Sequence, residues 1–188
     1  VEAVDIVFWP VAMDFKKHNL EAMADAAIVA ALVNGAVRTS EQEEMVRLLR
    51  RKSQLLIAYG SCAQLGGIPG LANQCEREDL LRYVYEEAPS VVNPEKVRPV
   101  ESYQEEGRTV TLPAFHQLVR SLDQVVEVDY YLPGCPPTPK LLQQALGTLL
   151  SGALPPRGTV LAPDIALCEQ CPRKEGKAPP VRNVSSPV

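Results

Sequence analysis

Short apolar runs that end in turn-forming residues predict the strands of this chain. They cover residues 4–9, 26–35, 55–59 and 125–131. Pro10 ends the first run because proline cannot donate to a strand ladder, Gly35 is the last residue of the second, and Gly60 follows the third. The pattern therefore predicts four short strands.

Apolar residues at helical spacing predict the helices between these strands. In the clearest case Met45, Leu48 and Leu49 recur on one face, after Thr39 or Ser40 as the cap. Glu43 stands three residues after Ser40 and would complete a capping box. The same reasoning predicts helices over residues 16–24, 76–87, 115–122 and 138–150, the last with Thr138 as its cap and Pro139 as its first residue.

The order of these elements predicts an α/β fold with a mostly parallel sheet. Residues 26–59 are typical of one strand–helix–strand unit with a right-handed crossover. Residues 88–113 lack a clean period, and we interpret them as an ordered excursion with a turn at 104–107. The composition changes after residue 150, which predicts one domain over 1–150 and an irregular C-terminal extension over 151–188.

Length and charge exclude several classes of protein. The 188 residues suffice for one buried core. A net charge of -4 argues against a nucleic-acid-binding protein, which would show a basic surface. No apolar run approaches the ~20 residues that cross a bilayer. Because the chain starts with Val1 and not with Met, just before an expected strand, we expect further residues upstream.

The five cysteines carry the candidate chemistry. An odd number is poor for disulfides and favours metal or redox chemistry in a cytosolic setting. Cys62 and Cys135 each follow an expected strand, and the carboxyl ends of parallel strands form the functional edge of such sheets. Glycines around both allow the close approach of a bulky iron–sulfur group. Two thiolates are half of a [4Fe–4S] site, so we expect two more ligands upstream of Val1.

The remaining candidates are weaker. We expect Cys75 to be a small buried residue that binds no metal. Cys168 and Cys171 form a C-x-x-C, a metal or redox signature that offers half a site. We expect His18 and His116 to be exposed or hydrogen-bonded imidazoles. For Arg38 three roles stay open, since it could face a partner, face a cluster or form a structural ion pair.

Three stretches together resemble the small subunit of cytosolic [NiFe]-hydrogenases. They are Val33 to Thr39, Gly60-Ser61-Cys62-Ala63 with Gly67 to Asn73, and Tyr130-Tyr131-Leu132-Pro133-Gly134-Cys135-Pro136-Pro137. The likeness covers roughly residues 1–175 and is strongest to the methyl-viologen-reducing, F420-non-reducing type. That family shares a flavodoxin-like domain, with helices on both faces of the sheet, with the 20 kDa iron–sulfur subunit of respiratory complex I.

The resemblance implies an electron-transfer subunit in the cytoplasm. Cys62 and Cys135, with an upstream C-x-x-C, would bind a proximal [4Fe–4S] cluster facing a large subunit that carries the nickel–iron centre. Cys168 and Cys171, with downstream ligands, would start a second cluster. Electrons would leave to an iron–sulfur or heterodisulfide-reductase-like flavoprotein subunit.

Two alternatives stay open from the sequence. One is a complex-I-like iron–sulfur subunit that takes no part in hydrogen chemistry. The other is a structural or binding protein with a zinc knuckle at Cys168 and Cys171 and a nucleotide site, although the chain lacks a glycine-rich phosphate loop.

Overall fold

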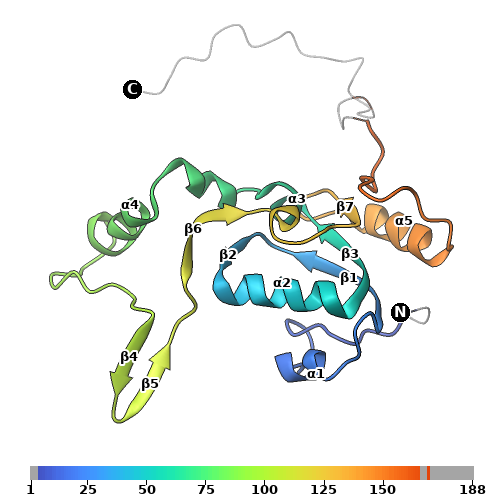
Figure 1. Ribbon diagram of the computed structural model, residues 1–188. Helices are drawn as coiled ribbons and strands as arrows, with labels where there is room; N and C mark the ends of the chain where they lie inside the picture. The colour runs from blue at the N-terminus through green and yellow to red at the C-terminus, as the bar shows by residue number, and fades with distance from the viewer. Residues whose placement is uncertain (1–3, 166–168, 170–188) are drawn as a thin grey trace, which may run out of the picture.

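The protein is an α/β domain built on a three-stranded parallel sheet (Figure 1). The structure, a computed structural model, describes residues 4–165 and residue 169. The strands β1 (Ile28–Asn34), β3 (Ser53–Tyr59) and β7 (Tyr130–Leu132) lie in the order β1-β3-β7. The predicted fold class is confirmed, and so is the strand–helix–strand unit over 26–59.

Helices cover both faces of this sheet, because apolar residues occupy both sides of β3. On one face Leu56 and Ala58 pack in one cluster with Val46 of α2 (Ser40–Lys52). On the other face Ile57 packs with Ala145 of α5 (Pro139–Leu150). The sheet with α2 and α5 is called the body below.

Both long helices begin with hydroxyl caps. The Thr39 hydroxyl accepts from the backbone N–H of Gln42 at 3.3 Å, and the Gln42 side chain accepts from the Thr39 N–H at 3.0 Å. The capping box of α2 therefore uses Gln42, and the predicted use of Glu43 is wrong. Thr138 caps α5 as predicted, with Pro139 in the first turn.

Two predicted elements are wrong, and a third, a strand, is shorter than expected. Residues 4–9 form no strand; Val7 and Phe8 pack against the cluster around Leu20, but no described strand pairs with this segment. The predicted helix over 115–122 is instead the strand β6 (Phe115–Arg120), which pairs antiparallel with β2 (Val37–Thr39). The expected strand over 125–131 is reduced to β7.

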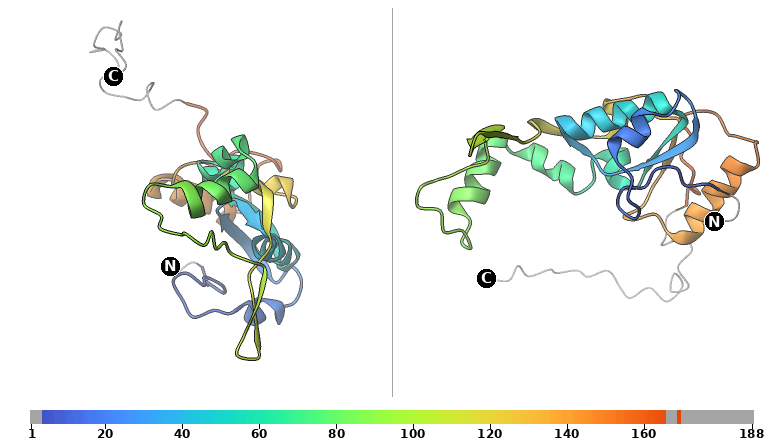
Figure 2. Two further views of the ribbon diagram at one scale, coloured as in Figure 1. Left: turned by 90° about the vertical axis from the view of Figure 1, so that its left-hand side faces the viewer. Right: turned by 90° about the horizontal axis from the view of Figure 1, so that it is seen from below.

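Residues 76–113, called the arm below, project from the body (Figures 1 and 2). The arm holds α4 (Arg77–Arg82), the π-helical turn η2 (Tyr83–Glu87) and an antiparallel hairpin of β4 (Ser102–Glu105) and β5 (Arg108–Thr111). The helix predicted over 76–87 and the turn at 104–107 are thus confirmed. Every residue of β4 and β5 is exposed.

Four short helices complete the described fold. They are α1 (Lys17–Glu21), α3 (Ser61–Leu65) and the 3₁₀ helices η1 (Pro69–Gln74) and η3 (Leu122–Gln124). The helix predicted over 16–24 is therefore present but shorter. Within the described residues, no helix is long and apolar enough to cross a membrane.

Candidate functional site

Cys62 lies where β3 turns into a short helix. Gly60 makes this turn with a φ of 87°, a conformation that glycine adopts without strain, and α3 follows it directly. Cys62 is partly buried in the first turn of α3. The sequence predicts a loop here, and the structure shows a strand–turn–helix that fixes the position of the cysteine.

Cys135 lies in the corresponding loop after β7. Gly134 before it has a φ of 137°, and an added Cβ there would lie 2.5 Å from the Cα of Pro137. A side chain at this position is therefore excluded by the backbone itself. Cys135 is exposed and is followed by a cis peptide bond to Pro136.

Backbone hydrogen bonds join the two cysteine loops. The Gly60 N–H donates to the carbonyl of Leu132 at 2.7 Å, continuing the pairing of β3 with β7. The Gly134 carbonyl then accepts from both the N–H and the hydroxyl of Ser61, at 2.7 and 3.0 Å. The residues immediately before Cys62 and Cys135 are thus in direct contact, although they are far apart in sequence.

Ser61 is a site residue that the sequence reasoning missed. Its side chain adds a second donor to the carbonyl that connects the loops, and a hydroxyl next to a candidate cysteine is the signal that could have identified it. We assign it a positioning role because its hydrogen bonds go to the loop backbone.

Gly67 leaves room beside the Cys62 thiol. An added Cβ at this position would lie 2.7 Å from the Cys62 Sγ and 3.0 Å from its Cα. Gly67 also has a φ of 55°. The loop after α3 therefore passes directly beside the thiol, and only glycine allows that approach.

The described residues supply two thiols at this edge of the sheet. Among them, no group of three or more His, Cys, Asp or Glu side chains is arranged to hold a metal ion. Cys75 is exposed at the end of η1, so the expectation that it is buried is wrong. Cys168 and Cys171 lie outside the described residues. Two thiols could supply half of the ligands of a four-thiolate cluster.

An acidic residue of α2 ties the returning strand β6 to the body. Glu43 pairs with Arg47 at 2.7 Å and with Arg120 of β6, and these hydrogen bonds lower its pKa from 4.5 to about 2. His116 is partly buried, and its Nε2 lies 3.1 Å from a Glu43 carboxylate oxygen without forming a hydrogen bond. His18 is exposed on α1, as expected.

The cysteine loop is tied to β6 as well. Asn73 of η1 donates to the carbonyl of Val119 and accepts from its N–H, both at 2.8 Å. The segment that follows Cys62 is therefore held against β6, which itself pairs with β2 after the carboxyl end of β1.

Comparisons with known proteins match most of the chain. Residues 1–149 match the family described as "NADH ubiquinone oxidoreductase, 20 Kd subunit". The chain is 40% identical over 174 residues to an F420-non-reducing hydrogenase iron–sulfur subunit of Archaeoglobus profundus, an alignment that covers 92% of this chain and 54% of the relative. It is 31% identical over 121 residues to the "NAD-reducing hydrogenase HoxS subunit delta" of Cupriavidus necator, over 64% of this chain and 54% of that protein.

A solved structure is similar both in fold and in sequence. It is the crystal structure of an NAD+-reducing [NiFe]-hydrogenase in the H2-reduced state, and it matches with a TM-score of 0.58 and 36% identity over 69% of this chain and 67% of that chain. The chain spans about half the length of the curated relatives it matches.

Proposed function

Because the chain belongs to the family of the 20 Kd subunit of NADH ubiquinone oxidoreductase, we propose that it is the electron-transfer subunit of a cytoplasmic [NiFe]-hydrogenase complex. In this proposal the complex is an oxidoreductase that acts on hydrogen, and the nickel–iron active site is on a large subunit. The names of the relatives support this assignment, since they are subunits of F420-non-reducing and NAD-reducing hydrogenases.

The observation that carries the proposal is the junction of the two cysteine loops. Ser61 and Gly134 hold them together at the carboxyl edge of the sheet. A site built from two adjacent cysteine loops on glycine-rich turns suits an iron–sulfur cluster, whose ligands are cysteine thiolates.

Cys62 and Cys135 would hold a [4Fe–4S] cluster together with a C-x-x-C upstream of Val1. The bound cluster would supply a one-electron carrier. The protein's own contribution is positional: Gly60 and Gly134 set the turns, Ser61 joins them, and Gly67 brings backbone close to one thiol. Backbone that lies so close to a ligand sulfur can tune the reduction potential of the cluster.

Cys168 and Cys171, with ligands further along the chain, would hold a second cluster and pass electrons to an acceptor subunit. Both lie in the C-terminal extension that we propose for residues 151–188, after a domain over 1–150. An iron–sulfur or heterodisulfide-reductase-like flavoprotein subunit is the acceptor in this proposal. The relatives extend well beyond the matched region, which leaves room for the additional ligands.

Anaerobic iron and sulfide analysis of the full-length complex tests the cluster site. Cys62→Ser and Cys135→Ser should each lose the iron of one cluster and its EPR signal. Cys75→Ser is the matched control and should keep both, because this exposed thiol lies at the end of η1, outside the two joined turns. Unchanged iron in both loop variants would rule the site out.

The runner-up is a complex-I-like subunit without hydrogen chemistry, which the family description favours. Hydrogen-dependent reduction of a viologen dye by the assembled complex separates the two. Dye reduction supports the hydrogenase, whereas a complex that holds its iron but fails to oxidise hydrogen supports the alternative.

A further inference from the structure

Arg38 on β2 is a buried charge for which the described residues offer no hydrogen-bond or ion-pair partner. Its residue is 9% exposed, and its Nε, Nη1 and Nη2 are buried without a hydrogen-bond acceptor anywhere in the described part of the chain. A guanidinium stays protonated and carries five N–H donors. Buried groups of this kind are normally paired, so the missing acceptor requires an explanation.

The surroundings of Arg38 compensate its charge only in part. The guanidinium carbon lies 4.4 Å from the centroid of the Phe115 ring, a cation–π contact. Arg77 contacts the same residue and donates to the Phe115 carbonyl at 3.0 Å. Burial and then the like charge of Arg77 lower the pKa of Arg38. The nearby charge of Arg77 therefore repels the Arg38 guanidinium.

The carboxylates on neighbouring elements are already paired. Glu43 binds Arg47 and Arg120, and Glu78 binds Arg77 and, at 3.4 Å, Arg98. Glu76 at the start of the arm accepts from Gln117. None of them contacts Arg38, so the described residues supply no anion that compensates its charge.

Exposed apolar side chains lie on the elements that flank this charge. Phe115 and Leu118 on β6 are 38% and 51% exposed, and Leu71 on η1 is 59% exposed. Asn73 holds η1 against β6, so these elements continue into the loop that carries Cys62. An arginine and an aromatic ring among apolar side chains are typical of the energetic centre of a protein–protein interface.

We infer that Arg38 is the anchor of the interface with the large subunit and binds the carboxylate of an Asp or Glu side chain that the large subunit supplies. This inference rests on the proposed function, which requires such a partner. The site is shielded from water in the described state, so neighbouring side chains must move to admit the carboxylate. Arg77 can move in this way, since 37% of its side chain is exposed. A large interface can offset the free-energy cost of that movement, whereas a free ion makes too few contacts to do so.

Arg38→Met in the full-length chain separates binding from folding. Replacing an unpaired buried charge by an unbranched apolar side chain should raise the melting temperature of the isolated chain by about 2–4 °C. The same change should weaken association with the co-purified large subunit by roughly thirtyfold or more. Arg38→Lys, which keeps the charge but loses the planar fork, should weaken association less. Arg51→Met on the exposed last turn of α2 is the control and should change neither quantity.

Three results would overturn the inference. A lower melting temperature for isolated Arg38→Met would show that the chain itself supplies the anion. Unchanged association would show that the partner does not use Arg38. Stabilisation of the isolated wild-type chain by sodium sulfate, lost in Arg38→Met, would indicate a free-anion site. Association is measured independently of hydrogen oxidation, so failure of the proposed function is recognised separately.

Discussion

The body and the arm are stabilised by different means. In the body Leu56, Ile57, Tyr130 and Leu132 are at most 2% exposed, and helices cover both faces of the sheet. In the arm neither α4 nor η2 contains a buried residue. The body is therefore stabilised by apolar burial that joins distant parts of the chain, and the arm by local polar contacts.

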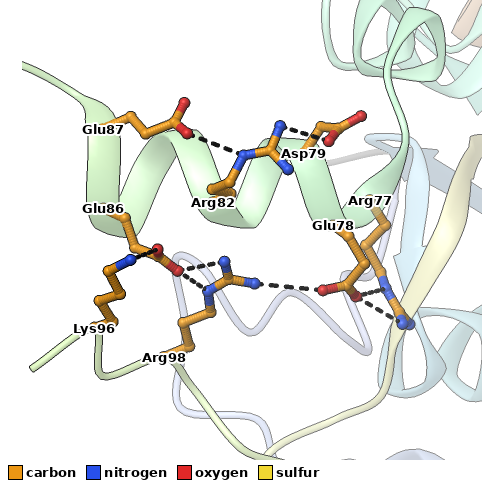
Figure 3. Close-up of polar contacts among 8 residues, drawn as sticks. All are labelled: Arg77, Glu78, Asp79, Arg82, Glu86, Glu87, Lys96 and Arg98. Carbon is orange, nitrogen blue, oxygen red and sulfur yellow. Dashed lines mark hydrogen bonds and ion pairs between the residues drawn. The ribbon is translucent and has the colours of Figure 1, made fainter.

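Ion pairs bind the arm to itself (Figure 3). Arg98 reaches back to Glu86 and to Glu78, and Arg82 pairs with Asp79 at 2.7 Å and Glu87 at 3.0 Å. The pairs of Arg82 are exposed, and exposed pairs contribute about 0.2–1 kcal/mol each. The arm should consequently open before the body does.

Removal of a buried carboxylate from the body should have the largest effect. Asp129 is fully buried, and its Oδ2 accepts from Arg50 at 2.6 Å and from the Leu56 N–H at 2.8 Å. Asp129→Ala should lower the free energy of unfolding by about 3–5 kcal/mol, because the Arg50 charge loses its partner. Urea denaturation measures this. Glu78→Ala in the arm is the comparison and should cost below about 1 kcal/mol; equal losses would erase the distinction.

Substitution of two glycines with positive φ allows the cysteine loop to be compared with the arm. Gly67→Ala places a Cβ 2.7 Å from the Cys62 Sγ, whereas an added Cβ at Gly107 meets nothing within 4 Å. Because both have positive φ, both substitutions carry a strain of about 1–2 kcal/mol. Gly67→Ala should cost about 1–3 kcal/mol more and lower the iron content of the complex. Iron loss in Gly107→Ala would contradict this placement.

A single carboxylate should control local opening of the arm. Glu86, with a side chain 13% exposed, binds Arg98 and lies 3.8 Å from Lys96. Glu86→Ala should weaken the arm by about 1 kcal/mol, which hydrogen exchange would report as faster exchange across 77–98 with an unchanged melting temperature. Glu87→Ala, at a side chain 53% exposed, is the control with a smaller effect. A fall in the global melting temperature would show that arm and body unfold together.

The contact between α2 and β6 should give the smallest effect and a pH dependence. Hydrogen bonds from Arg47 and Arg120 lower the pKa of Glu43 from 4.5 to about 2. A carboxyl with a lowered folded-state pKa stabilises above its unfolded value, and this contribution is lost as pH falls toward 2. The free energy of unfolding of the wild type should therefore exceed that of Glu43→Gln by up to about 1 kcal/mol at neutral pH. This difference should disappear between pH 4.5 and 2. Urea titrations across that range measure it; a constant gap would contradict the ion-pair explanation.

Short segments show where the local sequence does not predict the secondary structure. Phe115, Leu118 and Val119 have spacing that suits a helix, yet they lie on β6 because β2 offers a strand to pair with. That partner is distant in the sequence and only three residues long. Residues 4–9 show the converse, since an apolar run becomes a strand only beside a partner. The buried pair of Arg50 with Asp129 likewise leaves no local signal.

The sequence by itself determined the elements whose signals are local. The caps Thr39 and Thr138, the helix that starts at Pro139, the apolar strands β1 and β3, and the cysteines at the strand ends follow from neighbouring residues. Tertiary structure decided what depends on distant partners: the contact of Ser61 with Gly134, the closeness of Gly67 to the Cys62 thiol, and the burial of Arg38 against Phe115. The physical reason is range, because caps and periodicity act within a few residues, whereas pairing and burial depend on segments that only the folded chain brings together.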